Sequence, residues 1–506
     1  MPSTDNKRIA KNTAFLYFRM LLSIIVNLYT VRVVWHVLGV DDYGIYNVVG
    51  GIVIMFAFLN NAMVASSQRF ISFELGRGNN SRLQKTFSIS LTVHILIAIV
   101  VFILSETIGV WFLNTKLNIP IERMTAANWV LQCSIATFII TIISVPYNAC
   151  IVAHERMKIF GFFGILEVLL KLAIVFILII LPFDKLISYA CLLLCVSILM
   201  RLLYGLYCKK HFEECHYVYS KNVGLMKSMI SFAGWSFLGN LGFTIRDQGL
   251  NIVINLFFNV AVNAAKGIAN QMGGVINGFS QNFLMALNPQ ITKRYAAGNY
   301  LSMMNLVYSG CKFSALLMML IVIPLFFVVP QVLKIWLGDV TEYTTGFLQL
   351  VLIMVLIDSM ASPITTALQA TGRIRLFQII ISIIMLSSIP IACLLLLQWK
   401  IPYIVLYSSI FTSILALIAR LILLRRLIEF SYMTYLKKVI FRIIPTAIIS
   451  LIFAGLIHLL ISPSLLGLLL YGIITVSIYL ISAFFFGLNM NERRFALDVI
   501  RKRINK

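Results

Sequence analysis

Residues 15–32 read FLYFRMLLSIIVNLYTVR, an apolar run that two arginines interrupt. A run of this kind is typical of a helix that crosses a lipid bilayer, because about 20 apolar residues span the hydrocarbon core. A guanidinium group at the centre of a bilayer costs roughly 2.5–3.5 kcal/mol or more. The sequence therefore predicts that Arg19 faces a water-filled cavity, whereas Arg32, near the end of the run, reaches the interface.

The whole chain has the composition of an all-α integral membrane protein. Of its 506 residues, 60% are hydrophobic and only 12% are charged, and its mean hydropathy is +0.95. Soluble domains are about 45–50% apolar and about 25% charged. Windows of about 20 apolar residues predict about 14 transmembrane helices. These predicted spans are 12–35, 45–66, 87–112, 125–150, 160–181, 186–207, 229–256, 263–288, 305–330, 347–368, 376–397, 403–424, 439–461 and 465–487.

Basic residues alternate between the connections and explain the net charge of +23 without a nucleic-acid partner. With a cytoplasmic N-terminus, the inner loops and tails hold 30 of the 41 Lys and Arg residues. The outer loops hold only Lys116, Arg123, Lys185, Lys334 and Lys400. This asymmetry predicts a multi-pass protein with both termini in the cytoplasm. The basic tail RKRINK is expected to bind the anionic phospholipid bilayer.

Motifs of enzymes and of cofactor sites are missing from the sequence. No long segment outside the spans could fold as an enzyme domain, so we expect no catalytic residues. The eight cysteines have no metal or disulfide spacing, so we expect no metal. The chain also lacks a G-x-x-x-x-G-K-[ST] loop for nucleotide phosphates, so ATP is not expected to drive it.

The sequence repeats itself over six predicted spans. Residues 44–52 read GIYNVVGGI and residues 267–275 read GIANQMGGV. Three further pairs follow in the same order: LGRGN (75–79) with AAGN (296–299), VWFLN (110–114) with IWLGD (335–339), and PYNACIVAHERMKIF (146–160) with PITTALQATGRIRLF (363–377). An even number of helices per repeat gives both halves the same orientation, with the substrate site between them. We expect six-helix lobes at 1–210 and 211–430, and two extra helices with a basic tail at 431–506.

Polar side chains form stripes along the first, second, seventh and eighth predicted spans. Such stripes cannot face hydrocarbon without a large cost, so they are expected to face protein or water. The small-residue face of the second span could equally be a packing seam. The predicted cavity residues are Arg19, Ser23, Asn27, Asn47, Asn240, Asn251, Lys266, Asn270, Asn277 and Gln281.

Two acidic residues within spans are candidates for ion coupling. Asp247 and Asp358 could bind a proton or a sodium ion, or either could pair with an arginine. Glu167 and Lys171 are spaced i,i+4 and are expected to neutralise each other. Lys312 could snorkel toward the inner interface.

The stretch RVVWHVLGVDDYGIYNVVGGI (32–52), after a helix with an early arginine, resembles the polysaccharide transporter family of the multidrug/oligosaccharidyl-lipid/polysaccharide (MOP) flippase superfamily. The L-G-x-x-[DE]-[FY]-G element after the first span carries the resemblance, which covers residues 7 to about 430. It implies a Wzx-like flippase in the bacterial cytoplasmic (inner) membrane, with Arg19 as the cationic cavity residue. The implied substrate is an undecaprenyl-diphosphate-linked oligosaccharide for O-antigen lipopolysaccharide, capsule or exopolysaccharide, moved by alternating access.

Guanidinium and amide groups agree with such a substrate, because they bind diphosphate and sugar hydroxyls well. The membrane potential, or a proton or sodium gradient, could drive export, and a polysaccharide polymerase is a possible partner. Three alternatives remain: a lipid II flippase for peptidoglycan, a multidrug cation exporter of the same superfamily, and a membrane polymerase or ligase. The exporter would favour cavity carboxylates, and the enzyme would need a large outer loop with catalytic Arg or His.

Overall fold

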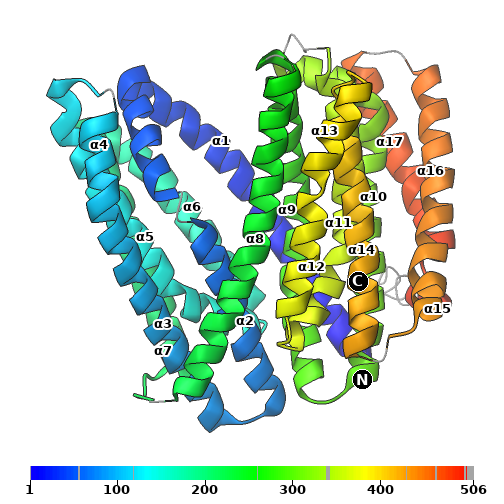
Figure 1. The fold of residues 1–506 in the computed structure, drawn as a ribbon, viewed down its shortest axis with the longest axis horizontal. Coiled ribbons are helices and arrows are strands. Elements are labelled where there is room, and N and C mark those ends of the chain that lie inside the picture. Colours follow the sequence, from blue (N-terminus) through cyan, green and yellow to red (C-terminus); the bar gives the residue numbers. More distant parts are fainter. Residues whose placement is uncertain are drawn as a thin grey trace. The chain divides into compact units, whose positions relative to one another are not determined.

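A computed structural model gives the fold of the chain (Figure 1). It describes residues 2–54, 57–117, 119–220, 222–258, 260–337, 342–428, 430–461, 464–494 and 497. Within these ranges the structure is helical and contains no strand, so the prediction of an all-α membrane protein is confirmed. Helices suit a lipid environment because they satisfy their own backbone hydrogen bonds.

The helices follow one another through short connections. The first seven are α1 (Pro2–Ile54), α2 (Ala57–Arg77), α3 (Asn80–Leu104), α4 (Val110–Lys116), α5 (Met124–Ala153), α6 (Met157–Ile180) and α7 (Lys185–His211). The next five are α8 (Val223–Phe257), α9 (Val260–Ala296), α10 (Tyr300–Leu337), α11 (Thr344–Ala370) and α12 (Arg375–Leu386). The last five are α13 (Ser388–Gln398), α14 (Ile404–Leu427), α15 (Tyr432–Tyr435), α16 (Phe441–Leu460) and α17 (Leu465–Ser482).

Each predicted span falls on these helices, and 11 described helices are long and apolar enough to cross a membrane. The predicted span 45–66 falls on α1 and α2, on either side of undescribed residues. Helices α8 and α9 are long enough to span but are not among the 11. Both carry the polar stripes that the sequence analysis assigned to a cavity.

The chain divides into two compact units, Met1–Asn240 and Leu241–Lys506. The division falls inside α8, and the two predicted spans after residue 430 belong to the second unit. The lobe boundaries predicted at 210 and 430 stay predictions. Each unit is described by itself below.

A glycine separates the first two predicted spans. Gly39 has φ 77° and ψ 173°, which is not a helical conformation, so α1 is two helices joined by a kink. Such a backbone is accessible to glycine because it has no Cβ atom. The second residue of the L-G-x-x-[DE]-[FY]-G element is therefore the residue that turns the chain between spans.

Two matched turns agree with the predicted internal repeat. Gly78 has φ 69° and Gly298 has φ 73°, and each follows the end of a helix. The next residue is an asparagine that begins the following helix: Asn79 accepts from Arg82 N at 2.9 Å, and Asn299 accepts from Ser302 N at 3.1 Å. The shared G-N pair thus ends one helix and caps the next in both halves.

A third turn also matches, but the two copies differ in residue type. Glu155 has φ 59°, and its repeat partner Gly372 has φ 75°. Both turns follow a helix with an internal proline, Pro146 in α5 and Pro363 in α11. A non-glycine residue in the left-handed region is uncommon and carries strain. The first unit therefore holds Glu155 in a conformation that suits glycine.

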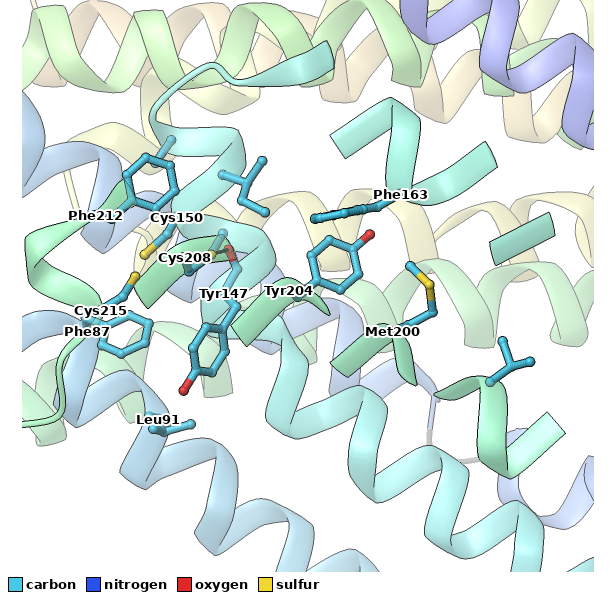
Figure 2. Close-up of a cluster of buried hydrophobic side chains, with 14 of the residues drawn as sticks. Phe87, Leu91, Tyr147, Cys150, Phe163, Met200, Tyr204, Cys208, Phe212 and Cys215 are labelled. Carbon is cyan, nitrogen blue, oxygen red and sulfur yellow. Dashed lines mark hydrogen bonds between the residues drawn. The ribbon is translucent and has the colours of Figure 1, made fainter. Parts of the chain in front are cut away.

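Aromatic side chains and cysteines fill the core of the first unit (Figure 2). Phe163 of α6 packs edge-on against Tyr204 of α7, with ring centroids 4.9 Å apart. Toward the other side of the same cluster lie the buried thiols of Cys150, Cys208 and Cys215. Side chains of this size join α5, α6 and α7 into one body by burying apolar surface.

The C-terminal helices α16 and α17 pack on α10 within the second unit (Figure 1). The Tyr479 hydroxyl of α17 donates to the Leu316 carbonyl of α10. Lys312 of α10, whose side chain is 4% exposed, donates to both carboxylate oxygens of Glu492 at 2.7 and 2.5 Å. Lys312 is therefore neutralised within the protein and does not snorkel.

Arg123 joins three separate segments of the first unit. Its Nε donates to Asp42 Oδ1 at 2.8 Å, and its Nη1 donates to Asp184 Oδ2 at 2.5 Å. Asp42 follows the kink in α1, and Asp184 begins α7 by accepting from Ile187 N. Partial burial works to raise the pKa of Asp184, but the hydrogen bonds from Arg123 and from Ile187 N outweigh it, so this pKa lies below its ordinary value.

We predict that Arg123→Gln destabilises the protein by about 1 kcal/mol, since it removes both charge-assisted contacts. Because the folded state lowers the pKa of Asp184, this contribution is present above about pH 4 and disappears as the pH falls further. Thermal unfolding of wild type and variant at pH 7.5 and below pH 4 checks both points. Lys400→Gln, at an exposed lysine, is the control. An equal deficit at both pH values would contradict the prediction.

We predict that Gly298→Ala costs about 1 kcal/mol of stability, because an added Cβ finds no atom within 4 Å and only the left-handed backbone opposes it. Gly472→Ala is the matched control: its site is equally open but lies inside α17. That change is expected to be neutral or stabilising by up to about 1 kcal/mol. Unfolding of the two purified variants measures the difference, and equal effects would refute the role of the turn.

Candidate functional site

Arg19 lies on α1 and points toward α6. Its guanidinium carbon is 4.7 Å from the centre of the Phe160 ring, a cation–π contact. The side chain is half-buried, and it donates no hydrogen bond to any residue in the described part of the chain. A cation–π contact does not pair the guanidinium with an acceptor atom, so its N–H groups remain available for a ligand. Arg19 is thus held in place without being neutralised by a direct ion pair.

Two glycines of α6 make room for α1. A Cβ on Gly164 would lie 2.9 Å from Nε of Arg19, and a Cβ on Gly161 would lie 2.3 Å from the Phe15 ring. Phe15 and Arg19 are one helical turn apart, as are the two glycines, so the contacts repeat along the helices. Close approach through small residues is common between membrane helices. Gly164 therefore sets where the guanidinium of Arg19 lies.

Glu167 and Lys171 form the predicted i,i+4 pair on α6, with Nζ 2.6 Å from Oε1. Both side chains are more than a third exposed, at 38% and 39%. The charge of Glu167 also acts on Arg19 and on Tyr204 of α7. Arg19, Lys171 and Glu167 together leave a net positive charge in this part of the first unit.

A second polar group joins α8 and α9 in the second unit. Lys266 is 1% exposed, and its Nζ donates to Asn251 Oδ1 at 2.6 Å, to Asp247 Oδ1 at 3.2 Å and to the Asp247 carbonyl at 3.3 Å. Asn270 Nδ2 donates to the same carboxylate oxygen at 3.2 Å. The structure thus brings together four of the residues that the sequence predicted for the cavity or for ion coupling.

The roles within this group differ from what residue type alone suggests. An ammonium group has three N–H donors, and Lys266 uses all three inside the protein. Asp247, in contrast, keeps 46% of its side chain exposed. In this structure Lys266 holds Asp247 and Asn251 in position, and Asp247, Asn251 and Asn270 are the partly exposed members of the group.

The other predicted cavity residues lie on the expected helices, some in the first unit and some in the second. Ser23 and Asn277 are half-buried, whereas Asn27, Asn240 and Gln281 are exposed. Asn47 lies in α1, but its side chain is outside the described residues. Their assignment to a substrate cavity stays a prediction.

Asp358 belongs to a third group, which the sequence analysis found only in part. It lies on α11, and its charge interacts with Arg246 of α8 and Arg420 of α14. Arg246 and Arg420 are 7% and 5% exposed. Sequence reasoning missed Arg420 because it was counted with the basic residues at the inner end of its span. The structure agrees with the alternative in which Asp358 interacts with arginine rather than with a coupling ion.

The chemistry of these groups suits binding rather than bond cleavage. Arg19 offers guanidinium donors, and Asp247 with its amide neighbours offers oxygen and nitrogen atoms for polar ligands. Phe160 and Gly164, which the sequence analysis also missed, position the guanidinium. A helical wheel could not find them, because it gives the face of a helix and not its neighbour.

Family comparisons agree with this picture. Residues 9–294 match the model of the family described as Polysaccharide biosynthesis protein, and residues 236–394 match the MatE family. No protein with a curated description matches the sequence.

Several solved structures share the fold of this chain. A MATE protein in complex with MaD3S is 13% identical, with a TM-score of 0.72 over 84% of this chain and 97% of that one. An outward-facing multidrug resistance MATE transporter of the MOP superfamily is 14% identical, with a TM-score of 0.72 over 83% and 95%. A MOP transporter from Pyrococcus furiosus, reported to have a binding pocket of reversed polarity, is 13% identical, with a TM-score of 0.68 over 83% and 95%. At these identities the likeness establishes the fold.

We predict that Lys266→Met destabilises the protein by about 2 kcal/mol. Breaking a fully buried pair costs about 3–5 kcal/mol, but half-exposed Asp247 remains partly hydrated, which reduces the loss. The double variant Lys266→Met/Asp247→Asn should recover part of it, because no lone carboxylate is left. Thermal unfolding of the two single variants and the double variant measures this coupling. Strictly additive effects would show that the pair contributes nothing to stability.

Proposed function

The chain belongs to the polysaccharide biosynthesis protein family, and we propose that it is a flippase that moves a lipid-linked oligosaccharide across the bacterial cytoplasmic membrane. The family and the fold make this chain a multi-pass transporter of the MOP superfamily. The proposed substrate is undecaprenyl-diphosphate-linked glycan for O-antigen, capsule or exopolysaccharide, transported by alternating access.

Arg19 carries this proposal. It is a half-buried arginine inside a spanning helix, stacked on Phe160, with no acidic partner in direct contact within the described residues. A charge at this depth is expensive, so such residues usually serve a ligand or a pathway. A diphosphate is the part of the proposed substrate that a guanidinium recognises best, through charge-assisted hydrogen bonds.

The driving force would come from the membrane rather than from a nucleotide. Moving an anion out of a cell with a negative interior gains about 2.3 kcal/mol per charge for each 100 mV. Half-exposed Asp247 is the better placed of the two acids to bind a proton or sodium ion during transport, since its carboxylate keeps contact with solvent. Both termini would lie in the cytoplasm, and a polysaccharide polymerase would take the product at the outer face.

Two other substrates of the same superfamily fold are the alternatives. A lipid II flippase would recognise the same diphosphate, so Arg19 is equally compatible with lipid II and with a surface-polysaccharide precursor as the substrate. A multidrug cation exporter would need a carboxylate where its cargo binds. Asp247 is the residue that supports this alternative. The family match favours surface polysaccharide.

We predict that cells without this protein accumulate one undecaprenyl-diphosphate oligosaccharide and that Arg19→Ala does not relieve the accumulation. Arg32→Ala is the matched control, because Arg32 lies on the same helix but is exposed, and it should restore the wild-type pool. Mass spectrometry of lipid extracts measures the accumulated lipid and identifies its glycan.

Each alternative has its own outcome in that experiment. Accumulation of lipid II would replace the proposed substrate by the peptidoglycan precursor. An unchanged pool of all lipid-linked sugars would refute the flippase and favour the exporter. Rescue by Arg19→Ala would remove Arg19 from the binding site. Immunoblots of the membrane fraction ensure that each variant is present at the wild-type level.

A further inference from the structure

The second unit contains two buried arginines that share one acid. Arg246 on α8 and Arg420 on α14 are 7% and 5% exposed, and Asp358 on α11 is the carboxylate whose charge acts on both. Arginine stays protonated in proteins, so the pair brings two fixed positive charges into the helix bundle. Asp247 also acts on Arg246, but it is paired with Lys266, so Asp358 and Asp247 together leave one positive charge of the group unbalanced.

Two guanidinium nitrogens of Arg420 also lack a hydrogen-bond acceptor among the described residues. Its Nε and Nη1 atoms are buried and have no partner among the described residues. Arg246 donates Nη1 to the thioether sulfur of Met385 at 3.0 Å, a weak acceptor. Leaving buried charged donors without an acceptor is costly, so a group that accepts hydrogen bonds and carries negative charge would stabilise this site.

The helices around the site are closely packed. A Cβ on Gly242 of α8 would lie 3.0 Å from Ser382 of α12, and a Cβ on Gly249 would lie 2.5 Å from Ile389 of α13. These glycines flank Arg246 one helical turn away on either side, so its side chain leaves α8 at a tightly packed seam. An occupant therefore has to be small, which excludes a glycan diphosphate.

We propose that Arg246 and Arg420 bind a small monovalent anion, such as chloride, inside the second unit. The ion accepts hydrogen bonds from the guanidinium groups, and together with Asp358 it brings the charge of the site to zero. Asp358 competes with the ion for the same two cations. The site belongs to the second unit, whereas Arg19 belongs to the first, and it does not depend on the identity of the transported substrate.

Chloride binding to the full-length protein tests the site. The protein is purified in detergent in sodium gluconate at constant ionic strength and pH, and saturable binding of radioactive chloride is measured by equilibrium dialysis. Wild type should bind chloride saturably. Arg420→Gln should weaken binding by at least about tenfold, because it removes a positive charge next to the ion. Arg32→Gln, at an exposed arginine, should bind like wild type.

Asp358→Asn provides a test in the opposite direction. Removing the competing carboxylate should tighten chloride binding by at least about tenfold. This variant decides the question even where Arg420→Gln does not fold, because gain of affinity requires a folded site. Absence of saturable binding in wild type, unchanged binding in a folded Arg420→Gln, or weaker binding in Asp358→Asn would each overturn the proposal. Displacement of chloride by inorganic phosphate more readily than by bromide would overturn the assignment to a small monovalent ion.

Discussion

A charged side chain inside a lipid-spanning bundle must find its compensation within the protein, and both units are organised around this constraint. Lys266 satisfies its donors with Asp247 and Asn251, and Lys312 satisfies its own with Glu492. Each solution fixes two helices against each other: α8 with α9, and α10 with the C-terminal segment. Polar contacts between helices in this chain therefore hold neighbouring helices together, a role that apolar packing has in a soluble protein.

Arg19 differs from these lysines, because no ion pair within the described residues compensates its charge, and this difference bears on function. Its cation is held over the Phe160 ring above the space left by Gly164, and no carboxylate within the described residues contacts it directly. A cation–π contact stabilises the charge without supplying an acceptor atom for its N–H groups. Lys266 and Arg19 thus differ in more than burial. The N–H donors of Lys266 are bonded to neighbouring residues, whereas those of Arg19 have no acceptor among the described residues.

Most of the fold could be predicted from the sequence, because a bilayer requires long apolar helices and because charged residues mark the loops between them. It also predicted the repeat, with which the paired Gly78 and Gly298 turns agree. The details of the site were less accessible. A helical wheel places Lys266 and Asn251 on polar faces, but it cannot indicate that all three N–H groups of the lysine donate hydrogen bonds to neighbouring residues. Arg123 looked like an isolated loop residue, because Asp42 and Asp184 are distant in sequence.

The matched turns at Glu155 and Gly372 also bear on the history of the chain. Two halves that bend their backbones at equivalent positions are what duplication of an ancestral six-helix gene would leave behind. Glycine fits the left-handed position without strain, whereas glutamate does not, so the first half keeps the same turn with a side chain that opposes it. The copies have thus been free to diverge in side chains while the path of the backbone stayed common to both.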